Sequence, residues 1–212
     1  MAPPRDSRIS FPELDAPLRS RGSPIAAARE DDARISGTQV IDFRRAMEKM
    51  LGAGPFSVAL ARLSPAQRAE YEAVLPVSWL RVSTQEALTI AAADVAGRDL
   101  YAFHAEASRR SIEQTLNTLW RALMRITTDD ALITRTTTIY AKTFDRGRLA
   151  SKIPVPGRSE VTVSDWPTIS ELSLRGVAIG VETVLRIAGR RDVRVVSERR
   201  PDGAFYRATW RP

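Results

Sequence analysis

The sequence predicts an α+β fold in which N-terminal helices pack on a C-terminal antiparallel sheet of about four strands, with one long helix inserted between two hairpins. Three observations carry this prediction. Apolar residues recur at helical spacing in the first part of the chain, and they alternate with polar residues in several stretches after residue 130. The predicted strands are grouped near the C-terminus instead of alternating with helices, which is typical of an antiparallel sheet.

The N-terminal half reads as a series of helices with clear start signals. Apolar side chains at helical spacing predict the first helix in the stretch TQVIDFRRAMEKML, and GAGP ends it. Ser64 and Gln67 form a capping box that opens a second helix. Ser83 and Glu86 form another box and open a third. A long helix is then expected over roughly 99–126, because helical spacing continues through that stretch.

The C-terminal half is expected to supply the sheet. The β-branched stretch LITRTTTIYAKTF predicts a strand that the turn DRG connects to RLASKI. SEVTVSDW predicts another strand with Val161 and Val163 on one face, and DVRVVSERRPDGAFYRATW predicts a hairpin that turns at PDG. Between them lies a long helix that Thr168 and Glu171 open as a capping box and that Gly189 closes.

The helix before Gly189 is apolar over most of its circumference, which predicts burial on two sides. Gly176 and Gly180 each cost about 1 kcal/mol in helix propensity relative to alanine. We therefore expect another element to approach the backbone closely at these glycines. That element is either the protein's own sheet or a second copy of the chain in a homodimer.

Composition excludes several classes of chemistry. The 212-residue chain has no cysteine, which excludes disulfides, zinc–thiolate sites, iron–sulfur clusters and cysteine nucleophiles. One histidine cannot build a protein-only metal site, and the sequence has no phosphate-binding loop or nucleophile elbow. We therefore expect no metal, no cofactor and no catalytic residues. Because no apolar run could span a membrane and no signal peptide is visible, we expect a cytoplasmic protein.

The chain is expected to have two parts. Residues 1–35 are predicted to be a disordered arm, because they contain five prolines and few large apolar side chains. Such a segment cannot bury enough surface to offset the entropy of ordering. Residues 36–212 are predicted to form a single α+β domain.

His104, the only histidine, lies in the stretch LYAFHAEASRRSIEQTLNTLW. On a helix, the main apolar face runs through Tyr101, Ala105 and Ser108, and His104 lies about 100° from the centre of that face. A histidine at such an edge usually has a satisfied hydrogen bond, which is the interpretation we favour. The alternative is a contact with haem or another ligand. On the favoured interpretation, a His104→Ala variant keeps its fold and its binding.

The chain carries a net charge of +7, and 29 of its 32 basic residues are arginines. The simpler interpretation is a GC-rich genome that favours arginine codons. The alternative is a nucleic-acid-binding protein that uses its arginine-rich C-terminal hairpin. In that case the contacting residues would be Arg194, Arg199, Arg200 and Arg207. Tyr206 and Trp210 are expected to face the core and not to join such a surface.

Several stretches resemble an uncharacterised paralogous family expanded in myxobacteria. They are ALARLSPAQRAEYEAVLPVSWLRVSTQEAL, LYAFHAEASRRSIEQTL, SEVTVSDWP and LRGVAIGVETVLRIAGRRDVRVVSERRPDGAFYRATW. The last stretch is also remotely similar to the closing helix and hairpin of vinyl-reductase-type ligand-binding domains. Those domains are related in fold to bacterial haem nitric-oxide-binding domains and to Bet3-like trafficking subunits. The resemblance implies an α+β fold, frequent dimers, and binding of a small hydrophobic ligand or a partner.

Two departures from these families bear on the cofactor. The vinyl-reductase-type pattern has cysteines where this chain reads SERRPDGAFY. Haem nitric-oxide-binding domains use a Tyr-x-Ser-x-Arg clamp for the haem propionates, and none of Tyr71, Tyr101, Tyr140 or Tyr206 begins one. Haem and metal are therefore disfavoured even where the fold is shared.

The sequence favours a non-enzymatic sensory, regulatory or scaffolding module that acts through protein–protein contacts or by binding a small apolar ligand. We expect a homodimer with an unknown protein partner. The residues expected at the ligand site or interface are Tyr101, Ala105, Ser108, Gly176 and Gly180. A nucleic-acid-binding protein is the second hypothesis, and an enzyme that uses Asp/Glu chemistry is the third.

Overall fold

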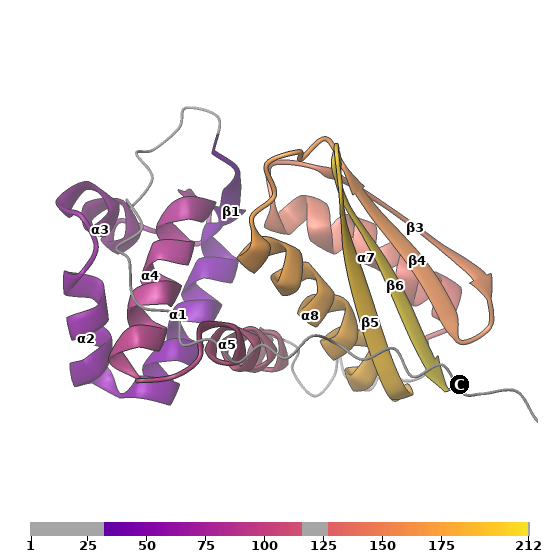
Figure 1. The fold of residues 1–212 in the computed structure, drawn as a ribbon, viewed down its shortest axis with the longest axis horizontal. Helices are drawn as coiled ribbons and strands as arrows, with labels where there is room; N and C mark the ends of the chain where they lie inside the picture. Colours follow the sequence, from indigo (N-terminus) through magenta and orange to yellow (C-terminus); the bar gives the residue numbers. More distant parts are fainter. Residues whose placement is uncertain (1–31, 116–126, 212) are drawn as a thin grey trace, which may run out of the picture.

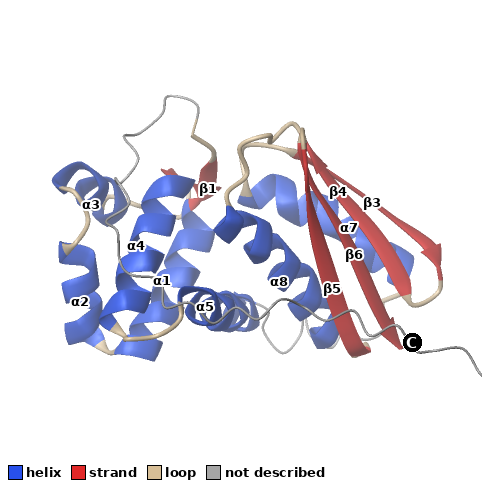
Figure 2. Ribbon diagram, in the orientation of Figure 1, coloured by secondary structure: helices blue, strands red, loops and turns tan. Residues whose placement is uncertain are grey.

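The computed structural model describes residues 32–115 and 127–211, and it has the predicted α+β fold. Helices form one end of the molecule and a four-stranded antiparallel sheet forms the other (Figures 1 and 2). The helices are α1 (Gly37–Leu51), α2 (Ala53–Ala61), α3 (Pro65–Glu72), α4 (Val82–Val95), α5 (Leu100–Thr115), α7 (Asp129–Thr143) and α8 (Glu171–Ile187). The strands are β1 (Arg34–Ser36), β2 (Trp79–Arg81), β3 (Arg148–Val155), β4 (Arg158–Ser164), β5 (Arg191–Arg200) and β6 (Gly203–Arg211).

The predicted arm falls almost entirely outside the described residues, and so does the end of the predicted helix over 99–126. Residues 32–35 of the arm are described. Arg34–Ser36 forms β1, which pairs antiparallel with β2. This pairing holds the start of the described chain against the helical half of the molecule, which comprises α1 to α5. Among the described residues, no helix is long and apolar enough to cross a membrane.

The N-terminal helices form as their apolar spacing predicts. Val40, Phe43 and Met47, which lie on one face of α1, are all buried in a core shared with α2, α4 and α5. The capping box at α3 is confirmed, because the Ser64 hydroxyl accepts from the Gln67 backbone N–H and the Gln67 side chain accepts from the Ser64 backbone N–H.

The predicted capping box at Ser83 and Glu86 is wrong. Helix α4 begins two residues earlier, at Val82, and its N-cap residue Arg81 makes no side-chain capping bond. Instead, the Ser83 backbone N–H donates to the Asp32 carboxylate at 3.3 Å. The Glu86 side chain reaches the start of α8, where it accepts from Ser173 Oγ at 2.8 Å. Tertiary partners therefore satisfy groups that local sequence pairing was expected to satisfy.

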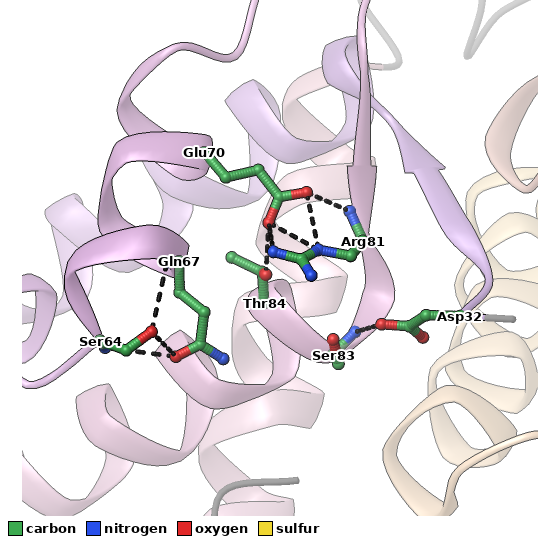
Figure 3. A network of polar contacts seen from close by, with 7 residues as sticks. All are labelled: Asp32, Ser64, Gln67, Glu70, Arg81, Ser83 and Thr84. Atoms are coloured by element: carbon green, nitrogen blue, oxygen red, sulfur yellow. Dashed lines mark hydrogen bonds and ion pairs between the residues drawn. The ribbon is translucent and has the colours of Figure 1, made fainter. Parts of the chain in front are cut away.

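A carboxylate on α3 fixes the start of α4 (Figure 3). Glu70 accepts from Arg81 Nη2 at 2.9 Å, from Arg81 Nε at 3.0 Å and from Thr84 Oγ1 at 2.7 Å. Burial alone would raise the pKa of Glu70, but the hydrogen bonds from Arg81 and Thr84 hold it below its usual value. The network joins three consecutive elements through one side chain.

Replacing that carboxylate is expected to destabilise the helical half. Glu70→Gln should lower the free energy of unfolding by about 1.5–3 kcal/mol, the range for hydrogen bonds to charged groups. Because the pKa of Glu70 is depressed, its contribution is present at neutral pH and is lost as the pH falls through its folded pKa. Urea denaturation checks this. Glu72→Gln is the matched control, since Glu72 makes an exposed ion pair with Arg68 and its replacement should cost less than about 0.5 kcal/mol.

The sheet has strand order β3-β4-β6-β5, and every neighbouring pair is antiparallel. The predicted C-terminal hairpin is confirmed, since β5 and β6 pair directly across the PDG turn. Val161 and Val163 are buried on the inner face, as are Tyr206 and Trp210. The strand alternation read from the sequence therefore assigns the core side of β4 and β6 correctly.

The stretch LITRTTTIYAKTF forms helix α7, so the predicted strand and its hairpin with RLASKI are wrong. Thr128 caps this helix by accepting from the Ala131 backbone N–H. Leu132, Thr136 and Tyr140 recur every four residues, a helical period that the β-branched composition masked. Strand propensity is a weak preference, and packing of the buried Leu132 and Tyr140 overrides it. The first hairpin is instead β3–β4.

Helix α8 lies at the centre of the molecule, between the N-terminal helices and the sheet (Figure 1). Its predicted capping box at Thr168 and Glu171 is wrong by two residues, because Ser170 is the N-cap and accepts from the Ser173 backbone N–H at 3.0 Å. Leu174 and Val177 pack in the core of the sheet half, together with Tyr140 of α7. The opposite side of α8 meets α5, so the predicted burial on two sides is confirmed.

Candidate functional site

A cavity of about 270 Å³ lies among α1, α4, α5, α7, α8 and β3. It therefore lies where the helical half meets the sheet half. Half of its lining residues have aliphatic or aromatic side chains. The apolar lining residues are Ile35, Phe43, Val82, Ile112, Ile139, Tyr140, Phe144, Leu149, Leu172, Val177, Val181 and Val184.

The two glycines of α8 form part of the cavity wall. A Cβ atom at Gly176 would lie 3.3 Å from Cε1 of His104. No described atom beyond its own helix and neighbours would lie within 4 Å of a Cβ atom at Gly180, and Gly180 lines the cavity. The element close to Gly176 is α5, through His104, and not the sheet. Their missing side chains make room for the imidazole and for the cavity.

His104 is buried in the wall of this cavity, with 9% of its surface exposed. Its Nδ1 atom is enclosed and has no hydrogen-bond partner in the described part of the chain. The ring packs 6.0 Å from the ring of Phe43, measured between centroids. Burial, with a smaller effect from the nearby Arg175 cation, lowers the pKa of His104 to about 4, so the imidazole is neutral at neutral pH.

The expectation that His104 has a satisfied hydrogen bond at the edge of a helix face is therefore wrong. The buried side of α5 runs through Phe103, His104, Ala107, Ser108 and Ser111. The centre of this buried side lies closer to His104 than does the centre of the apolar face that was predicted from the sequence. Helical phase places the residues of one helix relative to one another, but it does not say which neighbours cover each side.

Because the sequence-based prediction misplaced the buried side of α5, only some of the predicted site residues lie in the cavity. Ser108, Gly176 and Gly180 line the cavity, whereas Tyr101 and Ala105 do not belong to its lining. Tyr101 is 39% exposed, and the Arg175 guanidinium lies 3.9 Å from its ring centroid, in cation–π geometry. Tyr101 therefore covers Arg175 at the surface of α5 and α8.

The cavity also has a polar side, formed by side chains of α1, α4 and α8. Glu86 accepts hydrogen bonds from the hydroxyls of Ser170 and Ser173. Burial raises the pKa of Glu86, and the serine hydrogen bonds oppose this shift. Gln39 donates to Ser111 Oγ at 3.2 Å, whereas both polar atoms of the buried Gln85 side chain have no partner in the described ranges.

Of the four arginines of the nucleic-acid hypothesis, Arg194, Arg200 and Arg207 share the outward face of the sheet, whereas Arg199 lies on the other face. Arg200 and Arg207 flank the ring of Phe205, with guanidinium carbons 4.3 and 5.7 Å from its centroid. Arg199 instead donates to the Ile169 carbonyl and pairs with Glu171, next to the start of α8. Arg194 is exposed further along β5. Since Tyr206 and Trp210 are buried, Phe205 is the aromatic residue of β6 left for stacking.

Sequence reasoning missed the wall that α7 contributes. Thr136, Ile139, Tyr140 and Thr143 of this helix line the cavity. Their spacing of three and four residues was the available signal, but the run of threonines favoured a strand. Glu86 was also missed as a cavity residue, because it was assigned to a capping box.

The comparisons with known proteins identify the fold. No family model matches the sequence, and no curated protein matches it. Among solved structures, the Fe(II) unliganded H-NOX protein from K. algicida superimposes with a TM-score of 0.62 at 7% sequence identity, covering 84% of this chain and 97% of that chain. A mutant H-NOX protein of T. tengcongensis superimposes with a TM-score of 0.58 at 12% identity, covering 84% and 98%.

A third neighbour is an oxygen-binding H-NOX domain related to soluble guanylate cyclases. It has a TM-score of 0.56 and 11% identity, and the alignment covers 84% of this chain and 96% of that chain. The chain therefore has the fold of H-NOX domains, in agreement with the remote resemblance to haem nitric-oxide-binding domains. Membership of a myxobacterial paralogous family stays a prediction.

The residues around the cavity do not fit a haem. A haem has two propionates, and burying such carboxylates needs cationic partners. No arginine or lysine belongs to the described lining, and its charged residue, Glu86, would repel a propionate. The cavity volume also lies just below the range of about 300–1,000 Å³ typical for small-molecule sites. No group of three or more metal-ligating side chains occurs in the described ranges.

Proposed function

We propose that this protein is a sensory or regulatory module that binds a small, mostly apolar ligand in the cavity between α5 and α8. The observation that carries the proposal is an apolar cavity at the meeting point of two separate cores. An apolar ligand that displaces water from the apolar part of this lining would bind favourably. The H-NOX-like fold supports the proposal, since an H-NOX neighbour is described as oxygen-binding.

The position of the cavity suggests how binding would be transmitted. Its walls come from α1, α4 and α5 on one side and from α7, α8 and β3 on the other. A ligand that contacts both sides would favour one relative arrangement of the two halves over others. The change would be passed to a protein partner, which could be a second copy of the chain. This mechanism needs no catalytic residue, so we propose a non-enzymatic role.

Addition of a fitting ligand is expected to stabilise the fold. A neutral ten-carbon probe such as decanol, present at about 100 times its Kd, should add about 2.7 kcal/mol to the free energy of unfolding. Thermal denaturation with increasing decanol measures this as a rise in Tm that saturates. Decanoate, whose charge must be buried among apolar groups, should give little or no rise. A Tm that decanol leaves unchanged or lowers would contradict the proposed function.

A further inference from the structure

The imidazole of His104 lies in the wall of the cavity, and its Nδ1 atom has no hydrogen-bond partner among the described residues. It is 91% buried, and no hydrogen bond joins it to any described residue. Burying a polar group without a hydrogen bond is unfavourable, and most buried polar side chains have a partner. His104 is such an exception, as is Gln85 in the same wall, and a ligand could supply a partner only to a ring nitrogen that it can reach.

The geometry shows which side of the ring such a group can reach. Nδ1 is enclosed by protein atoms. The adjoining edge of the ring, formed by Cε1 and Nε2, lies next to Gly176, where a Cβ atom would lie 3.6 Å from Nε2. Because Gly176 has no side chain, this edge borders the cavity that both residues line. A ligand atom in the cavity can therefore approach Nε2 but not Nδ1.

The charges around the cavity select an uncharged ligand. The described lining offers no arginine or lysine to neutralise an anion, and Glu86 would repel one. Arg175, on the neighbouring turn of α8, disfavours a second cation beside His104. A neutral imidazole has one nitrogen that donates and one that accepts, so it can serve either a hydroxyl or a carbonyl.

We propose that His104 Nε2 is the polar anchor for an uncharged ligand with an apolar body and a single hydroxyl or carbonyl group. This inference rests on the proposed function and names the class of ligand for the same cavity. It replaces the sequence-based expectation that a His104→Ala variant keeps its binding. Gly176 is a positioning residue in this arrangement, because its missing side chain leaves room for the imidazole beside the cavity.

A thermodynamic cycle tests the anchor. Calorimetry would give the affinities of decanol and decane for the native chain and for His104→Leu, which removes both ring nitrogens. The ratio of decanol affinity to decane affinity should fall about tenfold in His104→Leu, the upper effect of one neutral hydrogen bond. Comparing this ratio between the two proteins cancels the difference in hydration free energy between decanol and decane. An unchanged ratio would overturn the role of His104.

Gln39→Leu is the matched control for this cycle. Gln39 also lines the cavity with a polar side chain, but its amide already donates to Ser111 Oγ. Its replacement should leave the decanol-to-decane ratio unchanged. If the ratio falls equally in Gln39→Leu and His104→Leu, the preference reflects general polarity of the wall, and the assignment to His104 is wrong.

A second measurement needs no substitution. Because His104 is the only histidine, its ¹⁵N resonances are identified without ambiguity in the native chain. Decanol should shift the Nε2 resonance strongly, whereas decane should leave it nearly unchanged. Equal shifts with both probes would overturn the anchor while leaving the proposed function in place. If neither probe binds the native chain, the proposed function itself fails.

Discussion

Filling the cavity from Gly180 is expected to abolish ligand binding while stabilising the fold. In Gly180→Leu the new side chain would enter the cavity, since an added Cβ meets no described atom within 4 Å. The substitution recovers about 1 kcal/mol of helix propensity and buries an apolar side chain. We expect the free energy of unfolding to rise by about 1–2 kcal/mol. Decanol affinity should fall by about 100-fold, equivalent to about 2.8 kcal/mol.

Gly54→Leu is the control for this prediction. Gly54 lies in α2, has equally open space around it and is far from the cavity lining. Its replacement adds the same side chain to a helix without filling the site, so decanol should bind as it does to the native chain. Gly180→Leu with native affinity for decanol would show that the probe binds elsewhere.

Acid is expected to destabilise the fold through His104. The unfolded histidine has a pKa near 6.5, whereas the folded one has a pKa of about 4. Between these values the unfolded chain binds more protons, so stability is present above pH 6.5 and is lost as the pH falls towards 4. At about 1.4 kcal/mol per pKa unit, the loss from His104 should be on the order of 2–3 kcal/mol.

His104→Leu isolates this effect, because every other titrating group stays in place. Urea denaturation across the range from pH 7 to pH 4 should show a smaller loss of stability in the variant than in the native chain. At neutral pH the variant should be at least as stable, since it removes a buried polar group that has no partner. Parallel pH profiles for the two proteins would mean that the imidazole is solvated or has a partner in solution.

Local signals in the sequence predicted the elements that depend on local chemistry. The Ser64 capping box and the PDG hairpin each satisfy backbone groups within a few residues, so their residue types are sufficient to predict them. The alternation around Val161 predicted the buried face of β4 for the same reason. The α+β class follows from these elements together.

The errors occur where distant parts of the chain supply the partner. Glu86 was expected to cap its own helix, but it accepts from serines more than eighty residues later in the chain. The threonine run of α7 has strand propensity, and packing of Leu132 and Tyr140 overrides it. Local pairing rules contain no information about either contact.

Only part of the candidate site could be predicted, again because local patterns do not say which distant elements meet. The glycines of α8 indicated a close approach, and helical spacing on α5 indicated a buried face. Which face meets which helix depends on the arrangement of α1, α5 and α8 in space, and this decides that His104 and Ser108 line the cavity while Tyr101 is at the surface. An isolated helical wheel cannot supply that arrangement.

Native mass spectrometry of the full chain mixed with decanol tests the central claim most directly, since it reports binding and stoichiometry together. The proposed cavity predicts one decanol per chain in the native protein and none in Gly180→Leu at the same probe concentration. No bound decanol in the native protein, or the same number bound to both proteins, would contradict a ligand site between α5 and α8.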